Sequence, residues 1–382
     1  MIYEIRLILV AFVILLLAGC NPSSTLLPTV TPKIQPEVWL TSTVTPTSTK
    51  EFTVDAKEPS INPLTGLPVE PRDLERRPVV VKVQNMPRSD RPQWGVSDAD
   101  LVYEYLIEFG DTRFAAVYYG RLPEKVGPIR SARHVDIQIV QAYKAILVFG
   151  GAYQDLFNLL LESDFKDRLI REGPNTAPAL YRYDPEGHNY LLANLTLLDE
   201  VLEKYGIDNS LQPLDGMVFA SEIPEGGEDA HQVYVRFSGS VYNRWDYDAV
   251  SGRYWRYSDA TNAMKIADEK YKPLFDRVTE QQIAVDNVIV LMAEYIPLIQ
   301  TSEAEVFDIQ LTGSGEVYLF RDGQCYQARW KRNRSEEVLS LWREDGRPLP
   351  FHPGQTWFEV LGRSSKVWQE EDGIWRFEFW MP

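Results

Sequence analysis

The pattern of apolar and polar positions divides the chain into three stretches of different character. An unbroken apolar run, Leu7 to Leu17, comes first, and a stretch rich in Thr, Pro and Ser follows it as far as about residue 60. From residue 61 onward, short β-branched and aromatic runs recur to the end of the chain, separated by Gly, Pro, Asn and Asp. Such runs are typical of strands joined by turns.

The first half of the body, residues 61–215, combines strand patterns with helical ones. The runs that predict strands are 78–83, 101–107, 112–119 and 145–149. Apolar residues at helical spacing predict helices over 131–143, 155–161 and 191–205, and the last should end at Gly206. Strands that alternate with helices indicate a mixed α/β domain in which helices pack on a central sheet.

The second half, residues 216–382, shows strand patterns almost throughout. The runs are 233–237, 288–292, 306–311, 317–320, 325–330 and 357–360, and residues 245–257 resemble a hairpin around Ser251-Gly252. Asp322-Gly323 is a second hairpin signal, because this pair suits the tight turns that join antiparallel strands. The fold class that we expect is α+β, with a mixed α/β N-terminal domain followed by a β-rich C-terminal region.

The N-terminal run suggests export rather than a membrane span. It is too short to cross a bilayer core of about 30 Å, and it has the length of a signal-peptide core. Leu17-Ala18-Gly19-Cys20 resembles the lipobox of bacterial lipoproteins, which implies a signal peptide over 1–19 and a diacylglycerol on Cys20. An uncleaved anchor and an ordinary secretory signal are the alternatives. On the lipoprotein interpretation, the protein is extracytoplasmic and held at the membrane by lipid.

Residues 20–60 should form a tether. This stretch has few large apolar residues, so it cannot bury enough surface to fold, and its prolines stiffen and extend it. A binding or glycosylated segment is the alternative.

Charge and cysteine content narrow the classes of partner. The formal net charge of −16 does not steer the body toward nucleic acid, so we expect no nucleic-acid partner. If Cys20 carries lipid, Cys325 has no intrachain partner, and a packed small residue is the simpler interpretation of it. His134, His188, His231 and His352 lack the spacing of a zinc site. We therefore predict neither a metal nor a cofactor.

Several segments together resemble a known family. They are 62–68, 77–81, 91–93, 98–104, 112–114, 127–133, 287–290, 313–315 and 353–357, with Asn85 between them. The chain resembles the YerB-like bacterial lipoproteins, a family of unknown function with an N-terminal and a C-terminal portion. The resemblance implies a lipoprotein with a two-part body and no assigned activity. One departure is 108–111, Glu-Phe-Gly-Asp, where the family pattern leads us to expect a Gly-rich turn.

The segment 127–134, Gly-Pro-Ile-Arg-Ser-Ala-Arg-His, holds the strongest candidate site. Ser131 is a plausible N-cap, and a helix N-terminus suits an anion. Arginines grip carboxylates and phosphates through two donors at once. The predicted ligand-binding residues are Arg113, Arg130, Ser131, Arg133 and His134. Their predicted salt-bridge or acid–base partners are Glu104, Glu108 and Asp136.

Three interpretations of this cluster stay open. The arginines could pair with those carboxylates and fasten helix to sheet, they could bind an anionic group of an envelope polymer, or His134, Glu104 or Asp136 could act as acid or base. We expect a non-catalytic, lipid-anchored binding or scaffold protein with an anion-binding arginine cluster. The alternatives are an envelope hydrolase or transferase acting on an anionic cell-wall substrate, and a structural partner of a membrane protein complex.

Overall fold

The computed structural model describes residues 59–381, and Ala56–Pro382 form one compact unit. The signal peptide, the lipidation site Cys20 and nearly all of the tether lie outside the described residues. Within residues 59–381, no helix is both long enough and apolar enough to cross a membrane.

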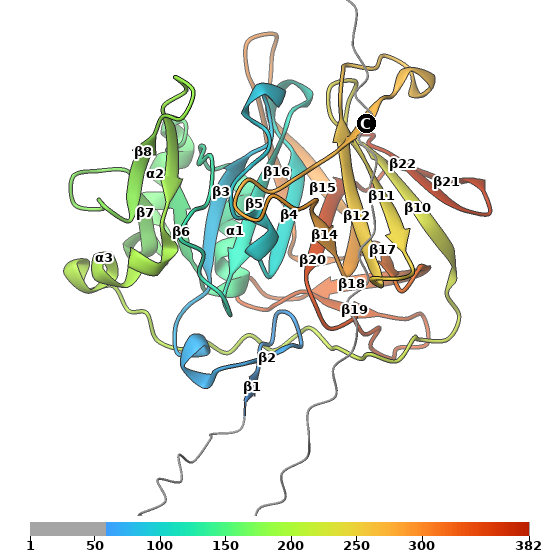
Figure 1. Ribbon diagram of the computed structural model, residues 1–382, viewed down its shortest axis with the longest axis horizontal. Coiled ribbons are helices and arrows are strands. Elements are labelled where there is room, and N and C mark those ends of the chain that lie inside the picture. Colours follow the sequence, from blue (N-terminus) through green and yellow to red (C-terminus); the bar gives the residue numbers. More distant parts are fainter. Residues whose placement is uncertain (1–58, 382) are drawn as a thin grey trace, which may run out of the picture. The chain divides into compact units, whose positions relative to one another are not determined.

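One large mixed sheet runs through both halves of the chain (Figure 1). Its first five strands stand in the spatial order β7 (Leu169–Arg171), β6 (Ile146–Phe149), β3 (Val79–Gln84), β5 (Thr112–Tyr118) and β4 (Leu101–Leu106). Beyond β4, the sheet continues into β20 (Thr356–Gly362), β15 (Asn287–Gln300), β17 (Gly313–Arg321), β18 (Gln324–Arg332) and β19 (Ser340–Trp342). The two halves of the sequence are therefore joined by the parallel pair β4–β20.

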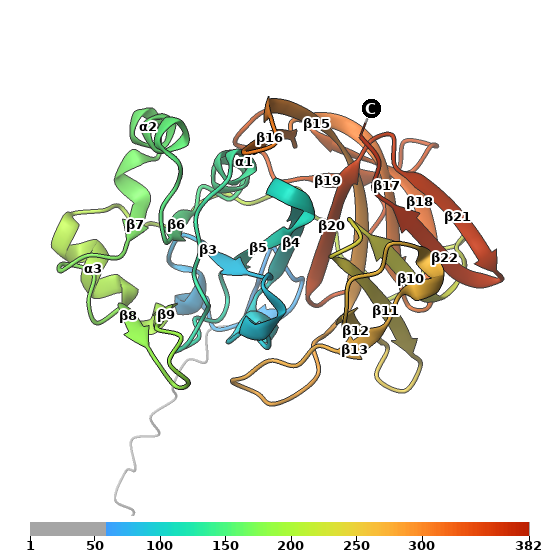
Figure 2. The same ribbon diagram turned by 90° about the horizontal axis from the view of Figure 1, so that it is seen from above.

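A second set of strands packs against the C-terminal part of this sheet. It runs β21 (Lys366–Glu371), β22 (Gly373–Glu378), β10 (Glu228–Arg236), β11 (Tyr242–Asp248) and β12 (Arg253–Asp259), with β13 (Tyr271–Pro273) and β14 (Ala284–Val285) on β12. The start of β10 also pairs with β18, so these strands curve around a common interior (Figure 2). Trp245 and Tyr254 of the predicted aromatic hairpin are buried in that interior.

The remaining elements lie at the periphery. They are β1 (Ser60–Ile61) with β2 (Pro68–Val69), β8 (Leu180–Tyr183) with β9 (Tyr190–Ala193), β16 (Glu305–Gln310) beside β15, and the helices α1 (His134–Tyr143), α2 (Gln154–Glu162) and α3 (Leu198–Tyr205). The structure is thus sheet-rich, and the Asp322-Gly323 turn joins β17 to β18 as predicted, with both residues at positive φ.

Two predicted helix boundaries are wrong. Residues 190–193 form β9 rather than the start of a helix, and α3 begins only at Leu198. All four residues of β9 are buried. A continuous apolar run of this length fits a strand buried on both faces better than a helix with only one buried face. The N-cap of α1 is Arg133 and not Ser131, because the Asp136 carboxylate accepts the backbone N–H of Arg133 at 2.6 Å.

The pairing of β4 with β20 creates an electrostatic problem in the core. It places Glu104 directly opposite Glu359, and both side chains are fully buried. Arg256, from β12 in the other layer, donates to Glu104 at 2.6 Å and to Glu359 at 3.0 Å. The Arg256 guanidinium also lies 4.3 Å from the ring centre of Trp357. One cation therefore offsets two carboxylates, since like charges at opposed positions would otherwise destabilise the pair.

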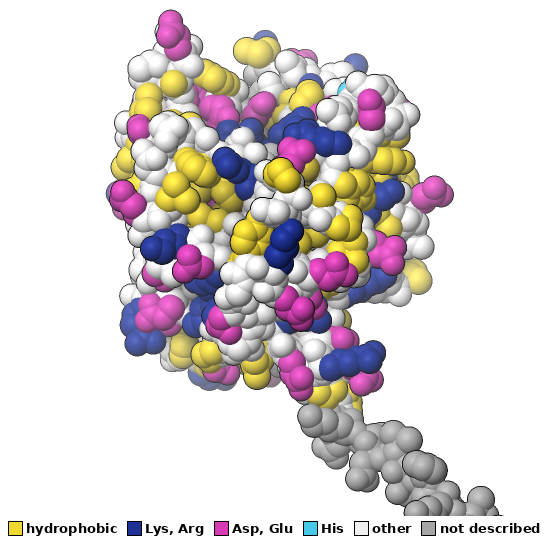
Figure 3. All heavy atoms as spheres, turned by 90° about the vertical axis from the view of Figure 1, so that its left-hand side faces the viewer, with side chains coloured by type: hydrophobic (Ala, Val, Ile, Leu, Met, Phe, Trp, Pro, Cys, Tyr) yellow, Lys and Arg dark blue, Asp and Glu magenta, His cyan; other side chains and the backbone are white. Residues whose placement is uncertain are grey.

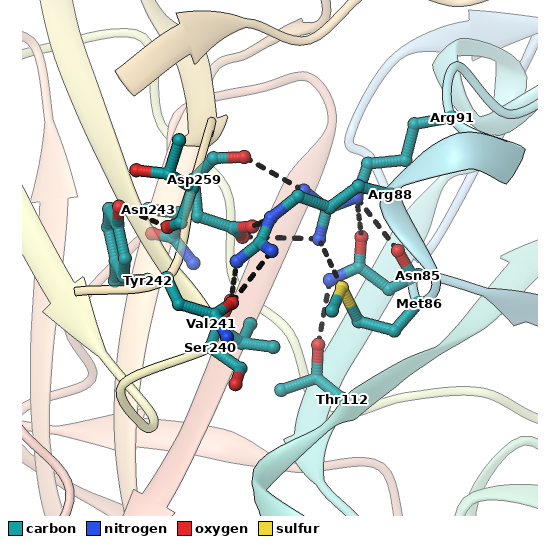
Figure 4. Close-up of polar contacts among 12 residues, drawn as sticks. Asn85, Met86, Arg88, Arg91, Thr112, Ser240, Val241, Tyr242, Asn243 and Asp259 are labelled. Atoms are coloured by element: carbon teal, nitrogen blue, oxygen red, sulfur yellow. Dashed lines mark hydrogen bonds and ion pairs between the residues drawn. The ribbon is translucent and has the colours of Figure 1, made fainter. Parts of the chain in front are cut away.

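A second polar connection joins the halves nearby (Figure 4). Arg88 and Arg91 both form ion pairs with Asp259 at the end of β12, the latter at 3.1 Å. The Nε of Arg91 donates to the backbone carbonyl of Asn85 at 2.7 Å, and the amide of Asn85 donates to Thr112 at 2.7 Å and to Glu104 at 3.0 Å. The buried polar groups thus form a chain from Asp259 to Glu104.

We predict that Arg256→Ala destabilises the protein by about 3–5 kcal/mol, the usual cost of leaving a buried charge without its partner. Urea unfolding measures this free energy. The control is Arg363→Ala, whose ion pair with Glu294 at 3.3 Å is exposed on both sides (66% and 47%) and should contribute at most about 1 kcal/mol. Equal effects of the two substitutions would contradict the role assigned to Arg256.

The same cluster predicts a pH dependence. Burial, and next the charge of Glu104, raise the pKa of Glu359 to about 7. A carboxyl whose pKa is higher in the folded than in the unfolded state contributes stability below the unfolded value of about 4.3, and that contribution is lost as the pH rises toward 7. We therefore expect the melting temperature of the wild type, relative to Glu359→Gln, to decrease from pH 4.5 to pH 8. For the exposed control Glu344→Gln, the difference in melting temperature from the wild type should stay constant between pH 4.5 and pH 8. Parallel profiles for the wild type and Glu359→Gln would refute the assignment.

Candidate functional site

The predicted arginine cluster is only partly brought together. Arg133 donates from Nε to Glu108 at 2.7 Å, and Arg113 on β5 lies 3.7 Å from the same carboxylate while donating to the carbonyl of Ser131 at 2.7 Å. Burial tends to raise the pKa of Glu108, but hydrogen bonding and charge from Arg133 outweigh it and the pKa is lowered. Burial, then the charge of Arg133, lower the pKa of Arg113 to about 10. Each arginine therefore already has a carboxylate or a carbonyl as its partner.

The other predicted residues lie in separate groups. Arg130 points elsewhere, to Asp90 at 3.4 Å, and its side chain is 38% exposed. The Nε2 of His134 lies 2.5 Å from the Tyr153 hydroxyl, and burial lowers the pKa of the imidazole. Glu104 belongs to the buried cluster with Arg256 already described.

Asp136 is buried with a different set of partners. Its carboxylate lies 3.0 Å from the Lys82 ammonium and accepts the Tyr105 hydroxyl at 2.5 Å. Burial lowers the pKa of Lys82 to about 8. The cavity beside Glu108 and Arg133 measures only about 10 Å³. The contacts of Asp136 with Lys82 and Tyr105, and of Arg133 with Glu108, therefore fasten the start of α1 to the sheet.

A larger opening lies at the far end of the sheet. A groove of about 740 Å³ runs between α2, β7 and the end of α3. Figure 3 faces the side of the molecule that carries these elements, and hydrophobic side chains gather there among Lys, Arg, Asp and Glu. Volumes of about 300–1,000 Å³ are usual for ligand pockets, so we take this groove as the candidate functional site.

Three local features of the sequence form this groove. Helix α2 turns Leu156 and Leu160 toward the core and leaves Leu161, which lines the groove, 50% exposed. Helix α3 ends at Gly206, whose φ of 65° turns the chain and leaves Tyr205 half exposed at the rim. Strand β7 is only three residues long and is followed by a loop through Gly173 and Pro174.

The lining of the groove combines apolar side chains with charges of both signs. Its apolar lining includes Phe149, Phe157, Phe165 and Ile170. Its rim carries Lys166, Arg168, Arg171, Asp164, Asp167 and Glu172, and the Arg171 guanidinium lies 4.8 Å from the ring centre of Phe157. This combination suits binding of a ligand with apolar and polar groups. No group of three or more potential metal ligands occurs among residues 59–381.

Sequence analysis missed this site, although one signal pointed to it. Residues 159–161 are three consecutive leucines in a short predicted helix, and a helix packed on one side cannot bury all three. The rest of the lining comes from residues 149–208, which carry no recognised motif and meet only through the fold.

A second cavity, of about 470 Å³, lies where three of the recognised segments meet. Asp100 accepts the Asn62 amide and the backbone N–H of Tyr119, both at 2.6 Å, while burial raises its pKa to about 6. Gln355 donates to the carbonyls of Ser97 and Ala99. These polar groups bond chiefly to one another, so the segments around them hold the strand ends together.

Cys325 fits the prediction of a packed residue. It is buried, and burial raises the pKa of its thiol well above the ordinary value.

Comparisons with known proteins agree with the resemblance found in the sequence. The N-terminal domain of "Protein of unknown function (DUF3048)" matches residues 64–208, and its C-terminal domain matches residues 233–358. "Putative lipoprotein YerB" of Bacillus subtilis (strain 168) is 30% identical over an alignment of 306 residues, and the match covers 78% of this chain and 85% of that protein. The crystal structure of YerB from Bacillus subtilis matches with a TM-score of 0.66 at 27% identity, over 79% of this chain and 96% of that chain. The chain therefore belongs to the DUF3048 family of proteins of unknown function.

Proposed function

We propose that the protein is a non-catalytic, lipid-anchored binding protein of the cell envelope, and that the groove beside β7 is its ligand site. The observation that carries this proposal is the groove itself, with its volume of about 740 Å³ and a lining of both apolar and charged side chains. The arginine cluster is the weaker candidate, because Arg113 and Arg133 share Glu108 and the adjoining cavity of about 10 Å³ has room for about one water molecule.

The lipid anchor rests on Leu17-Ala18-Gly19-Cys20 and on the name of the Bacillus subtilis relative. Two acyl chains on Cys20 would hold the body stably at a membrane, whereas one chain binds only marginally.

For the anchor, we expect Cys20→Ser to move the protein from the membrane fraction to the soluble extracytoplasmic fraction. The control is Cys325→Ser, which removes the other cysteine and should leave the protein on the membrane. Metabolic labelling with an alkynyl fatty acid should mark the wild type and Cys325→Ser alone. Membrane retention and labelling of Cys20→Ser would contradict the anchor.

For the ligand site, we expect at least one compound of an envelope panel to bind the full-length protein. The panel comprises peptides, cell-wall sugars, polyol phosphates and acyl chains, and binding is measured by calorimetry. Leu161→Glu places a charge in the groove and should weaken binding at least tenfold. Leu159→Glu, on the same helix and equally exposed but outside the groove, should bind like the wild type. Equal binding by all three proteins, or no binding by any, would refute the proposal.

A further inference from the structure

We infer that the groove receives an extended polypeptide segment, which pairs through its main chain with β7 as an added strand of the sheet. This inference rests on the proposed function and names the class of ligand. Its first support is the position of β7 in the sheet. Within residues 59–381, β7 pairs with β6 on one side only, at Leu169, Ile170 and Arg171, and no strand pairs with its outer edge. A strand edge of this kind presents to a partner those N–H and C=O groups that are not yet bonded. The carbonyl of Arg171 is not among them, because it accepts the Thr176 hydroxyl at 3.1 Å.

The second support is the way in which the groove follows the main chain. Every residue from Asp164 to Thr176 contributes to its lining, so the groove accompanies the whole of β7 and both of its flanks. Side chains of a strand alternate between the faces of a sheet. Leu169, Ile170 and Arg171 all line the groove although their side chains point to alternate faces, so the groove follows the edge of β7.

The third support is the placing of apolar contacts on the two sides of this edge. Phe157 and Leu161 on α2 lie on one side, and Tyr205 and Ile207 at the end of α3 lie on the other. An added strand projects alternate side chains in opposite directions, and each direction here meets an apolar surface. A single ring or sugar would contact one of these surfaces at a time and leave the edge unpaired.

The charges around the edge agree with a peptide ligand. Lys166, Arg168 and Arg171 stand among Asp164, Asp167 and Glu172, so neither sign prevails. A polyanion such as a polyol phosphate would meet attraction from the cations and repulsion from the carboxylates, so the charges give it no clear advantage. A mixed polypeptide segment can place both signs to match, and the register of its charges would then set its specificity.

The shortness of β7 limits the strength of the interaction. Three residues of strand and the following Pro174 offer few main-chain hydrogen bonds, and short strands with nearby proline protect a sheet from uncontrolled pairing. The added strand therefore depends on the flanking apolar contacts as well as on the edge.

The test begins with a display library of random decapeptides selected against the full-length protein. Selected peptides are synthesised and their affinities measured by fluorescence anisotropy against the wild type, Leu161→Glu and the control Leu159→Glu. We expect Leu161→Glu to lose at least tenfold in affinity and Leu159→Glu to bind like the wild type.

The decisive measurement is the affinity of two N-methylated forms of the best peptide. One form is methylated at the odd-numbered residues and the other at the even-numbered residues. Amides of an added strand point alternately toward β7 and away from it, so one form should lose about tenfold or more in affinity and the other should keep it. Amide hydrogen exchange at residues 169–171 should slow on binding.

Three results would overturn the inference. Equal tolerance of both N-methylated forms would show side-chain recognition without strand pairing. Peptide binding that ignores Leu161→Glu would place the peptide elsewhere. A panel in which wall sugars or acyl chains bind the groove while no decapeptide does would leave the proposed ligand site standing and remove the peptide alone.

Discussion

The arrangement of this protein depends on one guanidinium between two buried carboxylates. Glu104 and Glu359 face each other across the pair β4–β20, and Arg256 reaches them from the second layer. Two glutamates so placed would repel in the absence of Arg256, and Arg256 would be buried without partners in their absence. The positions of β4, β20 and β12, which lie far apart in the sequence, therefore depend on one another.

The cluster of Glu104, Glu359 and Arg256 shows that the two regions matched by the family domains do not fold as separate modules. Their matches end at residue 208 and begin again at residue 233, which suggests two independent modules. Yet the main sheet passes from β4 into β20 without interruption, and Arg88 and Arg91 of the first half bind Asp259 of the second. The halves share one sheet and one buried polar network, which gives the candidate groove at the opposite end a rigid support.

Much of the strand content could be predicted from the sequence, because β-branched runs such as 79–83 and 288–292 carry a local signal. The failure at 190–193 shows the limit, since a short apolar run suits a buried strand and a buried helix equally well. For the arginine cluster, the pairing of Arg113 and Arg133 with Glu108 could be predicted from the sequence. The partners of Arg130 and Glu104 could not, because Arg130 pairs with Asp90 and Glu104 with a β12 residue far along the chain. The groove was missed for the same reason, as its walls are assembled by the fold from segments without a motif.

The closure of β4 by β20 also bears on how the chain reaches its native state. Residues 101–106 emerge early from a ribosome or a translocation channel, but the strand that completes their edge lies at 356–362, close to the C-terminus. Until then β4 is an open edge beside an uncompensated Glu104. Contacts so distant in sequence make folding slow, so the incomplete chain passes through a long interval in which it is open to aggregation and proteolysis.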